Sequence, residues 1–206
     1  ILMSTPTFLL SYIRKCSKEQ FSSLRFVITG AEKLKERVAE SFEKKFGIKP
    51  FEGYGCTELS PVALLNVPDV IQGEMTQVGH RPGTAGHPIP GVAVKIVDPE
   101  TYKALGPDEE GLLFVKGPNV MLGYLADEEK TKNVIIDGWY NTGDIASEDE
   151  QGFITITDRL SRFSKIGGEM VPHLAIEEAI HEVLEAKEQI CVVTAVPDDK
   201  KGERLV

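Results

Sequence analysis

Two short segments combine glycine with hydroxyl, carboxylate and aromatic side chains, a mixture that suits a phosphate-bearing ligand. The first is GAE, residues 30–32, which follows an apolar run, and the second is GYGCTE, residues 53–58. Glycine lets the backbone approach a flat ligand closely, and Tyr54 offers a face for stacking. Thr57 and Glu58 supply a hydroxyl and a carboxylate, which suit a phosphate and its Mg²⁺. By itself, GAE would equally suit a tight strand-to-helix turn with its glutamate at the positive end of the helix dipole.

Two charged residues further along have the chemistry to bind a ribose. Asp144 follows Gly143 in WYNTGDI, and a carboxylate there would accept hydrogen bonds from both ribose hydroxyls. Arg159 follows Asp158 at the end of a later apolar run, and a guanidinium donates several hydrogen bonds to a ribose or a phosphate. Other roles stay open from the residues alone, because Asp144 would suit a turn and Arg159 a surface ion pair.

The cysteines and histidines give little sign of thiol or metal chemistry. The three cysteines are far apart without a CxxC pair, and the four histidines show no metal-ligand spacing. This usage argues against a disulfide framework and for a reducing compartment. Cys56 has no neighbouring histidine in the sequence to activate it, so we expect no nucleophilic role for it. We expect Cys191 in the core of a buried strand.

Composition and charge narrow the class of protein. The 206 residues are 41% hydrophobic and 27% charged, which is typical of a soluble globular protein and excludes wholesale disorder. A net charge of −9 argues against binding to nucleic acid and against binding to the surface of an anionic membrane. No apolar run approaches the roughly 20 residues that span a bilayer. The chain starts without Met, and its last residues, KKGERLV, have the pattern of a strand that begins rather than ends, so we expect a piece of a longer protein.

The first seventy residues predict a parallel βαβ layer. Thr5 and Pro6 have the residue types of a helix start. The run 24–30 predicts a buried strand, 31–47 an amphipathic helix that ends at a glycine, and 48–55 the next strand. A strand, a helix and a strand this close imply a right-handed crossover and a parallel sheet. Ligands bind outside the carboxyl ends of such strands, where both glycine-bearing segments lie.

The rest of the chain predicts antiparallel β-structure and then a small α/β unit. After a Pro- and Gly-rich stretch, strands of a small barrel or twisted sheet are expected over 92–97, 112–117, 140–146 and 153–158, with a short helix over 126–135. The stretch 160–171 is polar and glycine-bearing, and it precedes a helix over 174–184 and a buried strand over 189–196.

These elements predict an α/β fragment with three parts. Residues 1–70 are expected to form the parallel layer, and residues 71–160 an antiparallel, barrel-like subdomain of the same large domain. Residues 161–206 are expected to form a truncated small α/β unit.

Five segments in this order resemble one family. GAE, YGCTE, GLLFVKGPNVMLGYL, WYNTGDI and DRLSRFSKIGGEMV are similar to motifs of the acyl-adenylate-forming superfamily. That superfamily includes acyl-CoA synthetases, the adenylation domains of peptide synthetases and firefly-luciferase-type enzymes. The match runs from about Leu24 to the C-terminus and is highly specific as a set. GAEKLKE, EGYGCTE, GWYNTGDI, DEQGF and RFSKIGGEMV look most similar to one branch, the acyl-[acyl-carrier-protein] synthetase half of bacterial bifunctional 2-acylglycerophosphoethanolamine acyltransferases.

The resemblance implies two half-reactions. A fatty acid attacks the α-phosphate of ATP to give acyl-AMP and pyrophosphate, and the thiol of acyl carrier protein then takes the acyl group, in support of lysophospholipid reacylation. The resemblance also implies sites for adenine, phosphate with Mg²⁺, and ribose. The residues that match are Gly30, Ala31 and Glu32 for the adenine pocket, Tyr54 and its neighbour Gly55 for stacking, Thr57 for the α-phosphate, Glu58 for Mg²⁺, and Asp144 and Arg159 for the ribose.

The resemblance further implies that residues 161–206 begin a lid that rotates between the half-reactions. Lys165, Gly167 and Gly168 match the lid loop that faces the site during thioester formation, which makes Lys165 a candidate catalytic residue. Ser161 stands where the family's hinge residue is usually Asp or Lys, which leaves the hinge residue open. The family's phosphate loop and lid lysine are expected outside the chain, so we expect the chain alone to be inactive.

Two other functions stay open. One is an acyl-CoA synthetase that uses coenzyme A, and the other is a non-catalytic nucleotide-binding or interaction domain. All the residues that match the family's site are present, which argues against a non-catalytic domain. A cytoplasmic location is expected, with the longer protein at the inner face of the bacterial inner membrane if a part outside this chain attaches it.

Overall fold

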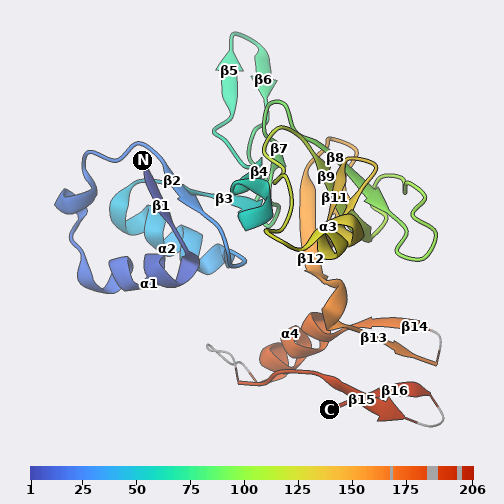
Figure 1. The fold of residues 1–206 in the computed structure, drawn as a ribbon. Coiled ribbons are helices and arrows are strands. Elements are labelled where there is room, and N and C mark those ends of the chain that lie inside the picture. The colour runs from blue at the N-terminus through green and yellow to red at the C-terminus, as the bar shows by residue number, and fades with distance from the viewer. Residues whose placement is uncertain (168, 185–189, 199–200) are drawn as a thin grey trace. The chain divides into compact units, whose positions relative to one another are not determined.

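A mixed five-stranded sheet organises the N-terminal part of the computed structural model (Figure 1), which describes residues 1–167, 169–184, 190–198 and 201–206. Strands β1 (Leu2–Ser4), β2 (Val27–Thr29) and β3 (Pro50–Gly55) are parallel, as the sequence predicts. Strand β4 (Val62–Leu65) runs antiparallel to β3, and β7 (His87–Pro88) completes the order β1-β2-β3-β4-β7. The carboxyl ends of β2 and β3 therefore lie at one edge of the sheet.

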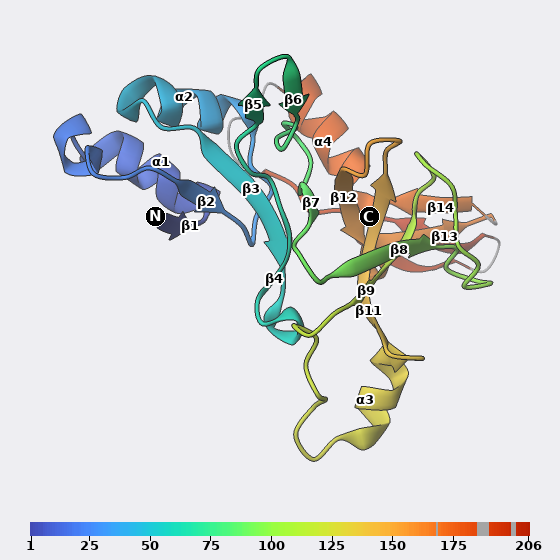
Figure 2. The same cartoon turned by 90° about the horizontal axis from the view of Figure 1, so that it is seen from above.

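Two helices and one 3₁₀ turn pack with β2 around an aromatic core (Figure 2). Helix α1 (Pro6–Lys15) starts as predicted, because the Thr5 side chain accepts a hydrogen bond from the backbone N–H of Phe8. Helix α2 (Glu36–Phe46) ends at Gly47, which has a left-handed φ of 73°. The 3₁₀ turn η1 (Lys18–Phe21) supplies the ring of Phe21, which stacks on Phe46 with centroids 4.4 Å apart. The periodic apolar face of α2 thus becomes this core.

The next sheet is open rather than closed into a barrel. Its strands are β8 (Ala93–Val97), β9 (Gly111–Lys116), β10 (Ile135–Ile136), β11 (Trp139–Glu148) and β12 (Ile154–Arg159). Their order is β10-β11-β9-β8, with β12 paired to β11. Helix α3 (Glu128–Val134) precedes β10, where a short helix is expected. The antiparallel pairing confirms the predicted class, and of the two expected forms, a small barrel or a twisted sheet, the structure excludes a closed barrel.

A hairpin that the sequence analysis does not predict lies between β4 and β7 along the chain (Figure 1). Strands β5 (Val70–Gln72) and β6 (Met75–Gln77) pair with only two residues between them. Gly73 has a φ of 62° at the first of these positions, which is the signature of a two-residue hairpin turn. The surrounding prolines and glycines obscured this pattern.

The chain divides into two compact units, of which the second comprises Gly143–Ile145 and Thr157–Val206. This unit contains η3 (Leu160–Arg162), helix α4 (His173–Val183) and a sheet of order β14-β13-β16-β15. The strands are β13 (Phe163–Ile166), β14 (Glu169–Pro172), β15 (Ala195–Asp198) and β16 (Gly202–Leu205). The first unit comprises Ile1–Thr142 and Ala146–Ile156.

One expectation for the second unit is wrong, and one stretch had no predicted element. The polar stretch 160–171, for which no helix or strand was predicted, forms η3 and the β13–β14 hairpin, because FSKI and EMVP have enough extended residues around a glycine turn to pair. The strand expected over 189–196 starts only at Ala195 among the described residues. Cys191 is half-buried and its neighbour Val192 is 68% exposed, so Cys191 does not lie in a buried core strand.

Candidate active site

The loop after β2 and the end of β3 lie side by side. The backbone N–H of Gly30 donates to the Ser4 carbonyl, 3.2 Å away, and Ala31 has a left-handed φ of 67°. A Cβ on Gly30 would lie 3.3 Å from the Gly53 carbonyl oxygen, so glycine permits the close approach of the two strands. The structure therefore brings together the two segments that the sequence analysis singled out.

Glu32 caps the first helix. Its Oε2 accepts hydrogen bonds from the Thr7 hydroxyl at 2.7 Å and from the Thr7 backbone N–H at 3.2 Å. Thr7 lies in the first turn of α1, where a carboxylate compensates the helix dipole and satisfies a backbone donor. This contact gives Glu32 a structural function whether or not it also lines a ligand pocket.

The end of β3 leads directly into a 3₁₀ turn that carries Thr57 and Glu58. Tyr54 is half-buried against the core beneath the second sheet. The turn η2 (Thr57–Leu59) follows and is held by a hydrogen bond from the Leu59 N–H to the Cys56 carbonyl, 3.0 Å long. Thr57 is exposed and Glu58 is partly buried. A hydroxyl and a carboxylate thus occupy one rigid turn at the edge of the sheet.

Replacing Gly55 by alanine is expected to lower the free energy of unfolding by about 3 kcal/mol. A Cβ on Gly55 would lie 1.8 Å from the Pro61 carbonyl oxygen, so the backbone of β3 or of the Pro61 segment must move. Gly47→Ala is the comparison, because Gly47 has a left-handed φ of 73°, which Gly55 lacks, but nothing within 4 Å of its Cβ position, and we expect a loss of about 1 kcal/mol from backbone strain alone. Urea unfolding of both variants measures the difference in the free energy of unfolding. Equal losses in the two variants would contradict the close approach of Gly55 to the Pro61 carbonyl.

The Glu58 carboxylate is hydrogen-bonded from a distant part of the chain. Its Oε1 accepts from the Tyr124 hydroxyl at 2.9 Å, across 66 positions of sequence. A hydrogen bond from its own backbone N–H, together with those from Tyr124 and Cys56, holds the pKa of Glu58 below its ordinary value. The carboxylate is therefore ionised at neutral pH, as a metal or phosphate site requires.

Cys56 is held as a thiol. Burial and the neighbouring Glu58 charge raise the pKa of Cys56 to about 11. Because the thiolate is the nucleophile, this environment disfavours nucleophilic catalysis, in agreement with the expectation from sequence. Among the described residues, no group of three or more His, Cys, Asp or Glu side chains is arranged to hold a metal ion. A Mg²⁺ ion at Glu58 would need other ligands, and Mg²⁺ commonly takes them from substrate phosphates and water.

The second unit contains the other predicted polar pair. Asp144 is 4% exposed, and its Oδ1 lies 3.0 Å from the Arg159 Nε. The Arg159 side chain is 67% exposed, so the pair joins a buried carboxylate to a solvated guanidinium. The backbone N–H of Arg159, rather than its side chain, donates to Asp158. The two residues expected at a ribose site are thus brought together by the fold.

Lys165 lies on β13 of the second unit. Its backbone N–H donates to the Glu203 carboxylate at 2.7 Å. Ser161 lies in η3, and Gly167 has a φ of 61° in the turn after β13. Gly168 lies outside the described residues.

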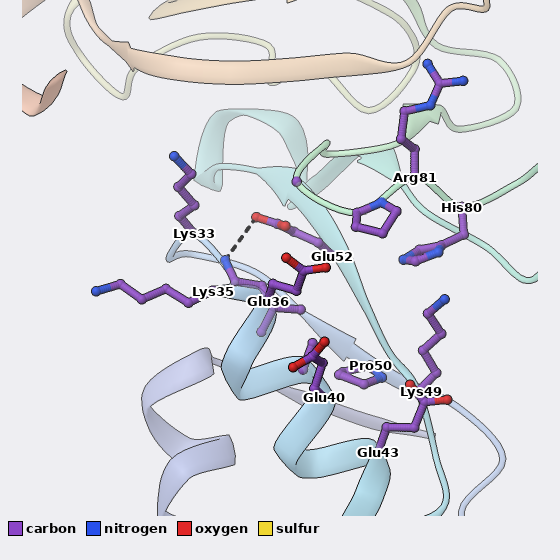
Figure 3. Close-up of a pocket in the computed structure, with 14 residues that line it drawn as sticks. Lys33, Lys35, Glu36, Glu40, Glu43, Lys49, Pro50, Glu52, His80 and Arg81 are labelled. Carbon is purple, nitrogen blue, oxygen red and sulfur yellow. Dashed lines mark hydrogen bonds between the residues drawn. The ribbon is translucent and has the colours of Figure 1, made fainter. Parts of the chain in front are cut away.

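A pocket of about 380 Å³ lies beside α2, between its first turns, the start of β3 and residues 80–83 (Figure 3). None of the predicted site residues lines it. The Glu52 carboxylate in this pocket accepts a hydrogen bond from the Leu34 backbone N–H at 3.2 Å. Glu52 therefore fixes the segment between the 30–32 loop and α2.

Glu52→Gln is expected to stabilise the protein more at pH 7 than at pH 4. Burial is the main cause that raises the pKa of Glu52 above its ordinary value. Because the pKa is higher in the folded state, protonated Glu52 contributes its full stability below the pKa of the unfolded state. That contribution is lost as the pH rises through the pKa of the folded state. Glutamine has no such loss and keeps an oxygen that accepts from Leu34. Thermal melts at both pH values test this, with the exposed Glu128→Gln as control, and a pH-independent difference between Glu52→Gln and the wild type would refute it.

The fold and the glycine-bearing turns suit a nucleotide ligand, and comparison with known proteins identifies the family. Residues 1–125 match the family described as AMP-binding enzyme. The ATP-bound crystal structure of MatB from Rhodopseudomonas palustris superposes with a TM-score of 0.79 and 32% identity, over 99% of this chain and 39% of that chain. The chain therefore belongs to the AMP-binding enzyme family.

Curated relatives include CoA ligases and a luciferin monooxygenase. A long-chain-fatty-acid–CoA ligase of Bacillus subtilis is 40% identical over 89% of this chain and 31% of its own length. A luciferin 4-monooxygenase of Photuris pensylvanica is 36% identical over 96% of this chain and 35% of its own length. The chain thus spans about a third of the length of these relatives.

Sequence reasoning missed two residues that support the η2 turn. Tyr124 holds the Glu58 carboxylate, and the Asn119 amide donates to the carbonyls of Leu59 and Val62 at 3.1 and 3.0 Å. Both lie in GPNVMLGYL, a segment that carried the family resemblance without any assigned role. Their position in a segment that resembles a family motif was the signal from which a supporting role could have been predicted.

Proposed function

We propose that the whole protein is an ATP-dependent fatty acid ligase. A carboxylate oxygen of the fatty acid forms a bond to the α-phosphorus of ATP, and pyrophosphate leaves with the electrons of the broken P–O bond. A thiol then attacks the acyl carbonyl, its proton is lost, and AMP leaves. The observation that carries this proposal is the ionised Glu58 carboxylate beside Thr57 in a rigid turn, at the edge where β2 and β3 end.

The donor set of the first unit fits a nucleotide phosphate with Mg²⁺. Gly30 and Gly55 let neighbouring backbone segments approach closely and so shape the turns, while Thr57 supplies a hydroxyl and Glu58 an ionised carboxylate. We assign Glu58 to hold Mg²⁺ and Thr57 to contact the α-phosphate. When bound, the ion would neutralise charge that develops on the phosphate.

The remaining residues have positioning roles in this proposal. Tyr54 offers its ring to the adenine, with Gly30, Ala31, Glu32 and Gly55 forming the adjacent backbone. In the second unit, Asp144 and Arg159 are assigned to the ribose, because a carboxylate and a guanidinium together accept from and donate to its hydroxyls. Lys165 is assigned to thioester formation, and residues 161–206 to the lid. Residues 1–160 are assigned to the large domain.

Two thiol acceptors are proposed for the second half-reaction. Similarity to the long-chain-fatty-acid–CoA ligases favours coenzyme A. The motifs GAEKLKE and RFSKIGGEMV favour acyl carrier protein, with lysophospholipid reacylation as the use of the product and a cytoplasmic location at the inner membrane face. None of the helices among the described residues is long and apolar enough to cross a membrane.

The test is fatty-acid-dependent exchange of labelled pyrophosphate into ATP by the whole protein. A panel of fatty acids of increasing length, with an aromatic acid for comparison, defines the acid. Product analysis with coenzyme A or holo-acyl carrier protein then defines the acceptor. Exchange that does not depend on any fatty acid would refute the ligase proposal, and the absence of acyl transfer to acyl carrier protein would leave coenzyme A as the acceptor. The chain alone is expected to give no exchange above background.

A further inference from the structure

The segment before α3 supports Glu58 through both its backbone and its side chain. The Met121 backbone N–H donates to the Glu58 carbonyl at 2.8 Å, and the Tyr124 hydroxyl donates to the Glu58 carboxylate at 2.9 Å. Figure 2 shows this segment passing close to the short helix between β3 and β4 before it reaches α3. Because both the backbone and the carboxylate of Glu58 are hydrogen-bonded, the side chain has little freedom to change its direction.

Tyr124 is itself fixed by the first turn of α3. Its backbone N–H donates to the Thr131 hydroxyl at 2.9 Å, and that hydroxyl donates to the Asp127 carbonyl at 2.8 Å. The Lys130 Nζ lies 4.2 Å from the centroid of the Tyr124 ring, a distance typical of a cation–π contact. The tyrosine hydroxyl is therefore held in place before any ligand arrives.

We propose that Tyr124 is a positioning residue that aims the Glu58 carboxylate at the metal–phosphate site. This inference rests on the proposed role of Glu58 as the Mg²⁺ ligand. Carboxylates that ligate metals are usually hydrogen-bonded by a second residue, and loss of such a partner typically costs about 10- to 100-fold in metal affinity or activity. A Tyr124 hydroxyl that occupies one side of Oε1 selects which carboxylate lone pairs face the ligand.

The test compares Tyr124→Phe with the wild type in the whole protein. Phenylalanine keeps the ring and its contact with Lys130 but removes the donor. Two quantities are measured: Mn²⁺ affinity in the presence of a non-hydrolysable ATP analogue, by electron paramagnetic resonance, and the Mg²⁺ dependence of pyrophosphate exchange. We expect the Mn²⁺ affinity, and the apparent Mg²⁺ affinity from the exchange assay, each to fall about tenfold per folded molecule. The KM for the fatty acid should not change. The matched control is Tyr102→Phe, because Tyr102 is 52% exposed and lies at a turn outside the site.

A double-mutant cycle separates positioning from general structural support. If Tyr124 acts through Glu58, then Tyr124→Phe will cause little further loss of Mn²⁺ affinity in a Glu58→Gln background. Equal losses in both backgrounds would overturn the inference, as would wild-type Mn²⁺ and Mg²⁺ dependence in Tyr124→Phe when Glu58→Gln is impaired. If Glu58→Gln itself keeps wild-type metal dependence, the assignment of Glu58 fails, and the inference about Tyr124 fails with it.

Discussion

Replacing Glu58 by glutamine is expected to lower the kcat of fatty acid adenylation by about 100-fold or more, with a smaller effect on the KM for ATP. Glutamine has nearly the shape of glutamate and still offers an oxygen to the Tyr124 hydroxyl, so the turn should stay folded. What is lost is the negative charge that would hold Mg²⁺. The ion's interaction with the phosphate strengthens as charge develops in the transition state, so kcat carries the loss.

Steady-state exchange kinetics and thermal melts of the same samples measure this effect. The control is Glu128→Gln, because the Glu128 side chain is 91% exposed and its carboxylate lies 3.8 Å from Lys132 Nζ on the same helix, so its kinetics should match the wild type. A Glu58→Gln variant that melts early and yet has wild-type kcat and KM per folded molecule would show that Glu58 is only structural. A loss confined to the KM for ATP would assign Glu58 to ground-state binding instead.

Replacing Asp144 by alanine is expected to raise the KM for ATP by about tenfold or more, while kcat changes less. A carboxylate that binds the ribose does so in the ground state and the transition state alike, so its loss removes uniform binding. The loss of the ion pair alone should cost little stability, about 1 kcal/mol or less, because the Arg159 side chain is 67% exposed and water can solvate it after the ion pair is gone.

This result is tested by ATP titrations at saturating fatty acid, with direct binding of ATP to each variant as a second measurement. Asp108→Asn is the control, because Asp108 is exposed and asparagine tolerates its left-handed φ of 63°. If Asp144→Ala unfolds more easily but binds ATP normally, then the Asp144–Arg159 pair only stabilises the second unit. Opposite kinetic signatures in the Glu58 and Asp144 variants would distinguish a metal ligand from a ribose ligand.

The family could be recognised from sequence because its motifs are short and local. GAE and YGCTE each end a strand, and glycines at these places make turns and close backbone approaches that tolerate little change. Their proximity followed from the parallel βαβ arrangement, which the spacing of strand, helix and strand already implied. Motif identity alone did not show which side chains orient Glu58.

The sequence was least informative where a short pattern had several solutions. FSKIGGEMV was described only as polar and glycine-bearing, and its glycines suit the hairpin turn that forms. The apolar run 189–196 predicted a buried strand, but the described strand starts at Ala195 and pairs with β16. Whether an apolar run is a buried strand depends on which partners cover it, and hydrophobicity alone does not specify them.

The sequence by itself determined the local structure and the family. Thr5 and Pro6 start α1, the periodic apolar face and Gly47 define α2, and the ordered motifs indicate an AMP-binding enzyme, because capping, periodicity and turn chemistry act over a few residues. Only the tertiary structure decided the partners of the charged groups. Tyr124 reaches Glu58, and Arg159 pairs with the nearly buried Asp144, because sheet pairing and core packing bring together residues that are far apart in the chain.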